Sequence, residues 1–277
     1  MPNAGSSRRI AWYVCLAAIL GLPVFGGRSA QAGTGAAGMI GRPGGLPDHA
    51  TLAFADDFGG TALDPAKWRT CYPWSPADGC TNASNNELQW YRPDAVTVHD
   101  GRLLITAGRA VPGLFREGKR FGYSSGLITT AHSFQMTYGY VEVRAQLPAG
   151  RGLWPAFWML PVDQSWPPEI DILEAIGQRP NEAILTYHGT TSDEPQAIVP
   201  VADLSAGMHT FAVDWRVEGI VWLIDDQEVF RVEAPVTAKP MYLLANLAVG
   251  GTFPGSPDAS TVFPASLVVD YIRAWTY

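Results

Sequence analysis

Three carboxylates lie within the six residues Glu169-Ile170-Asp171-Ile172-Leu173-Glu174, and the residues between them are aliphatic. Alternate residues of a β-strand face the same side, so Glu169 and Asp171 would share one face. Glu174 lies five positions after Glu169 and would face the opposite side of a regular strand. One extra residue, a β-bulge near Ile172 and Leu173, would return it to the carboxylate face. The spacing therefore predicts a bulged strand with one acidic and one aliphatic face.

A row of three acids on one strand face is unfavourable by itself. Successive side chains on that face are only about 6–7 Å apart, and like charges this close raise the pKa of at least one carboxyl group. A glycosidase uses such a row, because one carboxylate attacks or stabilises the sugar while a protonated carboxyl group donates to the leaving oxygen. A solvated acidic strand and a divalent-cation site are the alternatives that these residues leave open.

Aromatic residues precede the acids, in residues 152–161 (Gly-Leu-Trp-Pro-Ala-Phe-Trp-Met-Leu-Pro) and at Trp166. Rings beside carboxylates suit sugars, whose C–H faces stack on them while the hydroxyls seek polar partners. We expect Trp154 and Trp166, which lie next to proline and near the ends of the run, to line a cleft. Trp158 lies between Phe157 and Met159, and we expect it to fill the core.

The segments around these residues are predicted to form short β-strands. Charged residues make up only 16% of the chain, while it contains 29 glycines and 22 prolines, as in turn-rich β proteins. Strands are predicted at residues 102–106, 140–147, 210–216, 220–224, 228–232 and 267–275. No stretch shows a helical stripe over ten or more residues, so the pattern predicts an all-β sandwich or barrel.

The first 32 residues resemble a secretory signal. Arg8 and Arg9 precede an apolar run at residues 10–25 that is short for a membrane span, and Ala30-Gln31-Ala32 fits the small-x-small cleavage rule. An uncleaved N-terminal anchor is the alternative. We therefore expect a signal peptide at 1–32, a flexible lead-in at 33–48, a single catalytic domain at 49–277, and secretion to the periplasm or the exterior, with no membrane segment after cleavage.

Charge and cysteine content agree with export. Cleavage would remove three of the 19 basic residues, leaving 16 against 26 acidic residues, a net charge of −10. That charge argues against nucleic acid and anionic membrane as partners and is compatible with a neutral polysaccharide. Cys71 and Cys80 would remain, and in an exported chain we expect them to form one disulfide. A reactive thiol pair is disfavoured because their spacing is not Cys-x-x-Cys.

The run at 152–161, followed by Glu-Ile-Asp-Ile-Leu-Glu, resembles glycoside hydrolase family 16. The six-residue acid motif resembles the laminarinase-like, endo-β-1,3-glucanase branch of that family. Further motifs agree in order and spacing at residues 86–91, 123–126, 187–189, 246–251 and 269–273. Two places depart from the pattern: Leu127 stands where many laminarinase-like members have arginine, and residues 251–255 read Gly-Thr-Phe-Pro-Gly where those members have Gly-Gly-x-Trp-Pro-Gly.

The resemblance implies a curved β-jelly-roll sandwich of two antiparallel sheets, concanavalin A-like, with a concave substrate cleft. It implies that Glu169 is the nucleophile, Glu174 the general acid/base and Asp171 the residue that tunes their protonation. The implied activity is a secreted, retaining endo-β-glucanase that hydrolyses β-1,3-glucan or mixed-linkage β-1,3/1,4-glucan through a glycosyl-enzyme intermediate. No cofactor is expected for catalysis, and the protein is expected to be a monomer.

Other residues take candidate roles. Asn86, His188 and Asn246 are expected to bind substrate, with turn or packing roles as the alternatives, and His188 could instead bond the acid pair. The resemblance also implies a structural Ca²⁺ on the convex side, held by Asp57 and Gly101 mainly through backbone carbonyls and by Asp270, because hard oxygen ligands suit that ion. A charge at an exposed edge is the alternative for Asp270.

Two rival functions stay open. One is a depolymerase or transglycosylase of another β-linked polysaccharide, such as an exopolysaccharide. The other is a non-catalytic glucan-binding lectin on the same fold. Lectin-like relatives typically lose the acid pair, whereas this chain has all three acids, which favours the enzyme.

Overall fold

The computed structural model describes residues 46–75, 79–189 and 194–277. All of them belong to the second of two units, residues 1–41 and residues 42–277, into which the chain divides. The predicted signal peptide and residues 33–45 of the predicted lead-in lie outside the described residues. Within the described ranges, no helix is both long and apolar enough to cross a bilayer.

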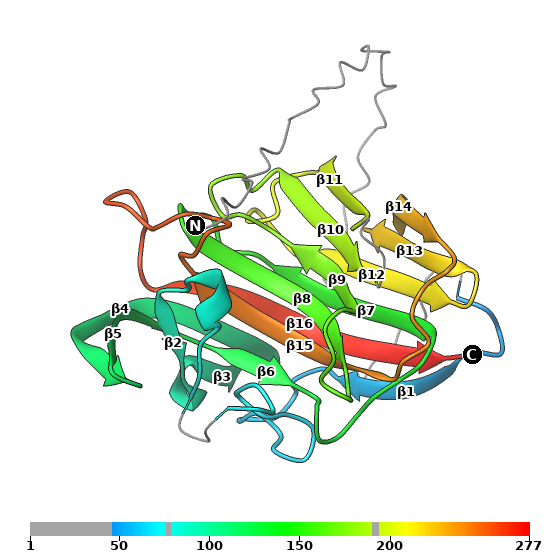
Figure 1. The fold of residues 1–277 in the computed structure, drawn as a ribbon, viewed down its shortest axis with the longest axis horizontal. Helices are drawn as coiled ribbons and strands as arrows, with labels where there is room; N and C mark the ends of the chain where they lie inside the picture. Colours follow the sequence, from blue (N-terminus) through cyan, green and yellow to red (C-terminus); the bar gives the residue numbers. More distant parts are fainter. Residues whose placement is uncertain (1–45, 76–78, 190–193) are drawn as a thin grey trace, which may run out of the picture. The chain divides into compact units, whose positions relative to one another are not determined.

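Two β-sheets make up the described part (Figure 1). The larger has ten strands in the order β14-β13-β12-β7-β16-β4-β5-β2, with β1 on β16 and β3 on β4. Its strands are β1 (Thr51–Asp56), β2 (Gln89–Tyr91), β3 (Val96–His99), β4 (Arg102–Arg116), β5 (Lys119–Ser125), β7 (Gly139–Gln146), β12 (His209–Arg216), β13 (Gly219–Ile224), β14 (Gln227–Glu233) and β16 (Ala265–Thr276). All pairings in it are antiparallel except β2 with β5, which are parallel.

The smaller sheet has six strands in the order β11-β10-β9-β8-β15-β6 and is antiparallel throughout. Its strands are β6 (Leu127–Thr129), β8 (Leu153–Pro161), β9 (Glu169–Glu174), β10 (Glu182–His188), β11 (Gln196–Pro200) and β15 (Met241–Val249). Two short 3₁₀ turns, η1 (Ala83–Asn85) and η2 (Pro93–Ala95), flank β2. The predicted two-sheet, jelly-roll sandwich fold is confirmed.

The predicted strands fall on observed ones, with one large difference in length. The segment predicted at 102–106 is the start of β4, which continues to Arg116 and folds back on β5 as a hairpin. The register of that hairpin shifts between Arg109 and Leu114, around Pro112 and Gly113. These two residues are typical strand breakers, so the local sequence concealed the extension that pairing with β5 supports.

The main core lies between the two sheets and is built by strand alternation. Phe157 of β8 stacks on Phe211 of β12, with ring centroids 6.3 Å apart. The fully buried Trp222 of β13 donates from Nε1 to the backbone oxygen of Asp171, at 2.8 Å. Burying each large apolar side chain contributes about 1.5–3 kcal/mol. The larger sheet therefore supports, from beneath, the strand that carries the three acids.

A second apolar cluster lies on the opposite face of the six-stranded sheet. It combines Leu160 of β8 and Tyr242 and Leu244 of β15 with Tyr72 and Tyr91, which belong to a segment that precedes the hairpin. We call residues 69–75 and 79–91 the covering segment. One end is held by the backbone bonds of Arg69 with Thr129, and the other by the pairing of β2 with β5. The covering segment therefore forms a wall on this face of the smaller sheet.

The predicted disulfide between Cys71 and Cys80 is present in the covering segment. Closing a loop of this sequence separation should stabilise the fold by about 2–3 kcal/mol, mainly by restricting the unfolded chain. We expect the Cys71→Ser/Cys80→Ser double variant to lose that much free energy of unfolding in a urea titration. A reducing agent should bring the wild type to the same value and leave the variant unchanged. Equal stability of oxidised wild type and variant would contradict this expectation.

Candidate active site

The bulge predicted in β9 is confirmed by the pairing on both sides of the strand. On β8, Trp158 pairs with Asp171 and Phe157 with Leu173, so β9 carries one residue more than its partner. On β10 the register shifts at the same place. The extra residue is Ile172, which is buried in the main core with its neighbour Leu173. Glu174 is thereby returned to the face that carries Glu169 and Asp171.

The three acids line one cleft of about 900 Å³. Its floor is the outer face of the six-stranded sheet, and the covering segment and two loops contribute to its walls. Besides the acids, the cleft is lined by aromatic, amide, carboxyl and imidazole side chains. They include Tyr72, Trp74, Asn85, Glu87, Trp154, Trp158, Trp166, His188, Tyr242, Asn246 and Phe253. Large rings, amides and carboxyl groups in one groove suit a ligand with both apolar faces and hydroxyl groups.

Burial and mutual repulsion raise the pKa of each acid. Burial, then the charge of Glu169, raises the pKa of Glu174 to about 7. Burial, then the charge of Glu174, raises the pKa of Asp171 to about 6. Burial and the neighbouring Asp171 also raise the pKa of Glu169 well above its usual range. Near neutral pH the cluster therefore retains protons that isolated carboxyl groups would have lost.

Two tryptophans bond directly to the outer acids. Nε1 of Trp154 donates to Oε1 of Glu174 at 2.9 Å, and Nε1 of Trp166 donates to Oε2 of Glu169 at 2.6 Å. A donated hydrogen bond favours the ionised form of its acceptor. The bond to Glu174 uses one carboxyl oxygen and leaves the other to carry a proton. Both tryptophans were predicted to line the cleft; their bonds to the acids were not predicted.

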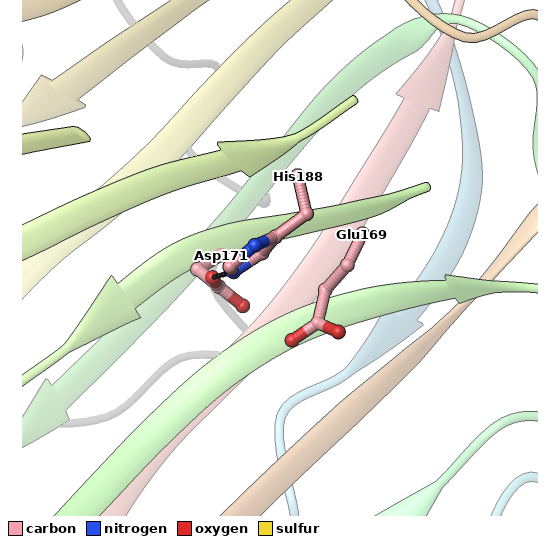
Figure 2. A group of neighbouring side chains, drawn as sticks. All are labelled: Glu169, Asp171 and His188. Carbon is pink, nitrogen blue, oxygen red and sulfur yellow. Dashed lines mark hydrogen bonds and ion pairs between the residues drawn. The ribbon is translucent and has the colours of Figure 1, made fainter. Parts of the chain in front are cut away.

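His188 lies on β10 beside the acid row and points at Asp171 (Figure 2). Its Nε2 is 3.1 Å from Oδ2 of Asp171, and its Nδ1 is 3.5 Å from Oε1 of Glu194. Burial by itself would lower the pKa of His188, but the hydrogen bond and charge of Asp171 raise it to about 9. The imidazole is therefore a cation at neutral pH, and it partly balances the charge of the middle acid. Two roles were predicted for His188, binding of substrate and a bond to the acids. The structure shows a bond to Asp171.

Glu169, Asp171 and His188 could also hold a metal ion, because one donor atom from each lies within 4.8 Å of the others. Among the described residues no other group of His, Cys, Asp and Glu side chains meets this condition. An imidazole must be neutral to bind a metal, whereas the pKa of His188 is about 9. A metal at this site would therefore have to displace a proton from His188 and break its bond to Asp171.

The carboxylates of both acidic residues in the predicted Ca²⁺ site lie beside arginines. Nε of Arg273 donates to Oδ1 of Asp57 at 2.9 Å, and Nη1 of Arg144 donates to Asp270. A guanidinium beside each carboxylate already balances its charge and disfavours a cation at the same oxygens. The Asp270 carboxylate, the one side chain predicted to hold the ion, is therefore already paired with Arg144 and does not fit the ion. Gly101 forms an exposed turn between β3 and β4, and a site built on backbone carbonyls stays a prediction.

The two asparagines predicted to bind substrate take different positions. Asn86 ends η1 in a left-handed conformation, with φ of 55°, is exposed, and is not among the residues that line the cleft; Asn85 and Glu87 line it instead. Asn246 does line the cleft, but its Oδ1 accepts from Nε1 of Trp158 and its Nδ2 donates to Oη of Tyr91. Asn246 therefore orients Trp158.

The prediction that Trp158 fills the core is wrong. Trp154 and Trp158 are four residues apart on β8 and therefore share the cleft face, while Phe157 and Met159 face the core. Strand alternation could have placed Trp158 from the sequence. Tyr72 and Trp74 were missed because they lie in a loop far from the acids in sequence. Phe253, at the departure from the family pattern, keeps an aromatic ring in the cleft, edge-to-face with Trp154 at 5.3 Å.

Glu87 was also missed. It is buried, and it accepts hydrogen bonds from Nε2 of Gln89 at 2.5 Å and from Nδ2 of Asn85 at 3.2 Å. Burial raises the pKa of this carboxyl group as well. Gln89 in turn accepts from the backbone N–H of Val249 on β15, so Glu87 helps to fix the covering segment to the sheet.

Comparison with known proteins agrees with this geometry. The model of the family Glycosyl hydrolases family 16 matches residues 83–272. The chain is 40% identical over 241 residues to endo-1,3-1,4-beta-glycanase EglC of Rhizobium meliloti (strain 1021), across 82% of this chain and 52% of that protein. It is 41% identical over 239 residues to endo-1,3-1,4-beta-glycanase ExsH of the same strain, across 80% and 51%. The chain thus spans about half the length of these curated relatives.

A solved structure shows the same fold. The X-ray structure of the laminarinase from Rhodothermus marinus superposes with a TM-score of 0.72 at 34% identity, covering 82% of this chain and 98% of that one. The matched region, residues 83–272, contains all three acids, His188 and Asn246. The family match covers more than half of the chain, and the cleft carries the acid row; the chain belongs to glycosyl hydrolases family 16.

Proposed function

We propose that this chain is a secreted, retaining endo-β-glucanase that acts as a monomer on β-1,3-glucan or mixed-linkage β-1,3/1,4-glucan. The observation that carries the proposal is the bulge at Ile172, which brings Glu169 and Glu174 to one face of an aromatic-lined cleft. The similarity to an endo-1,3-1,4-beta-glycanase and a laminarinase supports β-glucan as the substrate class. The signal-like residues 1–32 support secretion.

In the proposed reaction, Glu169 attacks the anomeric carbon while Glu174 protonates the leaving glycosidic oxygen. A glycosyl-enzyme ester forms on Glu169, and Glu174, now ionised, removes a proton from the water that hydrolyses this ester. Both carboxyl groups have a raised pKa, so the pair keeps a proton near neutral pH. The reaction needs that proton on Glu174, and the bond from Trp166 favours the anionic form of Glu169.

The proposal is tested by incubating the protein with laminarin, lichenan and cellulose side by side, together with an exported exopolysaccharide. We expect new reducing ends from laminarin or lichenan, with internal cleavage seen as a rapid fall in viscosity. The first product should have the β configuration when its anomeric proton is followed by NMR. Release from the exopolysaccharide alone would establish the rival depolymerase, and an α first product would contradict the retaining route.

The pH dependence should respond to Trp154. Since Glu174 must be protonated to donate, kcat/KM should fall as the pH rises through the pKa of about 7. Trp154→Phe removes a hydrogen bond that lowers this pKa, so the alkaline limb should move up by about one pH unit. Trp158→Phe is the matched control, because Nε1 of Trp158 donates to Asn246 and not to Glu174. A limb that stays in place in Trp154→Phe, or moves down, would contradict the assignment.

A further inference from the structure

Two stacked aromatic rings of the covering segment form part of the cleft wall. The rings of Tyr72 and Trp74 lie 4.9 Å apart with an interplanar angle of only 6°. Tyr72 is buried, whereas Trp74 is 54% exposed, and both line the cleft. Tyr72 thus supports one face of the indole while much of Trp74 remains open to solvent.

The rings lie on the side of the cleft opposite His188. Tyr72 meets Trp158 edge-to-face, with centroids 6.3 Å apart, and Trp158 pairs with Asp171 on one side and with Leu244 of β15 on the other. Tyr72 belongs to the same buried cluster as Leu244 and Leu127, the latter from β6 beyond β15. An aromatic row therefore runs from Trp158 to Tyr72 and Trp74, across the strands and away from β9.

Tyr72 is held in place by several independent contacts. Its neighbour Cys71 is bonded to Cys80, and the backbone of Cys80 exchanges hydrogen bonds with Tyr91 at 3.2 and 2.7 Å. The ring of Tyr91 lies edge-to-face with Tyr72, at 6.2 Å, and its hydroxyl oxygen accepts from Asn246 of β15. Leu127, where the family often has arginine, gives this cluster an apolar base. A platform fixed before binding loses little conformational entropy when a ligand arrives.

We propose that Trp74, supported by Tyr72, is a subsite that stacks on a glucosyl unit beyond Trp158, on the β6 side of the cleft. The C–H face of a β-linked pyranose is apolar and matches the open face of an indole ring. The assignment rests on the proposed endo-β-glucanase function and adds to it a preference for long chains. Only a substrate that extends past Trp158 reaches this subsite.

The test compares a polymer with a short substrate in the Trp74→Ala variant. The polymer is the glucan that the wild type hydrolyses with the highest kcat/KM. The short substrate is the smallest oligosaccharide that the wild type cleaves. We expect the kcat/KM for the polymer, divided by the kcat/KM for the oligosaccharide, to fall about tenfold. A loss of this size is typical when an aromatic side chain that contributes to binding is truncated. Most of the change should lie in the KM for the polymer. Trp74→Phe should recover part of the loss.

Two controls separate the outcomes. Phe115→Ala removes an exposed ring of β4 that does not line the cleft and should leave the ratio unchanged. Binding of the polymer to Glu169→Gln, with and without Trp74→Ala, should show the same tenfold loss in calorimetry, independent of turnover. An unchanged ratio and unchanged affinity in Trp74→Ala would overturn the subsite. Absence of hydrolysis by the wild type on every glucan would instead overturn the proposed function.

Discussion

Replacing Glu169 with glutamine is expected to reduce glucan hydrolysis by about 10⁴-fold or more, because the amide cannot form the glycosyl ester through which the proposed reaction passes. Glutamine has nearly the same shape as glutamate, and its carbonyl oxygen can still accept the bond from Trp166. The substitution also removes one of three close negative charges, so the fold should be at least as stable. Reducing-end release and calorimetry with a soluble glucan measure the two effects separately.

Binding should survive in Glu169→Gln while turnover does not. Glu228→Gln is the matched control, since Glu228 lies on β14, paired with Arg231 and away from the cleft, and should keep full activity. A wild type that binds glucan and releases no reducing ends would favour the lectin. Substantial hydrolysis by Glu169→Gln would remove it from the nucleophile role.

Glu174→Gln is expected to cost about 10²–10⁴-fold on polysaccharide, since the leaving oxygen then departs without a proton. The loss should be far smaller for an aryl glucoside with a good leaving group, which needs no protonation. With that substrate the glycosyl-enzyme should accumulate, because no base activates water, and a small anion such as azide should restore turnover by attacking it directly. The alkaline limb near pH 7 should also disappear, since Glu174 titrates there.

The leaving-group comparison is the decisive measurement for Glu174. A general acid predicts a loss that depends on the leaving group, whereas a purely structural carboxyl group predicts the same loss on every substrate. An equal loss on polymer and aryl glucoside, with the alkaline limb still present, would therefore contradict the assignment. In the cation-binding alternative, the same variant would lose affinity for a divalent ion measured by calorimetry without substrate.

Local patterns predicted much of this protein. The bulge in β9 follows from counting five positions between Glu169 and Glu174, because strand faces repeat every two residues. Strand patterns gave six of the ten strands of the larger sheet, but not β1, β2, β3 or β5. They also did not give the length of β4, which depends on pairing with β5. In β8, the alternation of strand faces would have placed Trp158 in the cleft with Trp154. The apolar neighbours Phe157 and Met159 wrongly suggested that Trp158 lies in the core.

Other features depend on contacts between residues distant in sequence. Asn246 bonds to Tyr91, 155 positions away, and Ser125 bonds to the backbone of Leu247, 122 positions away. Such contacts make Asn246 the residue that orients Trp158, while its role in binding sugar stays a prediction. Asn86 instead ends a short turn at positive φ, so its neighbours Asn85 and Glu87 line the cleft.

The sequence by itself determined the acid row, its bulge, the disulfide and the family, because strand periodicity, cysteine number and motif order are properties of neighbouring residues. Only the tertiary structure decided which rings form the cleft, which acids receive tryptophan hydrogen bonds, and how far the pKa values rise. Those properties depend on burial and on distances across strands, which chain order does not specify. The wall that carries Tyr72 and Trp74 exists only once the covering segment has packed on β6 and β15.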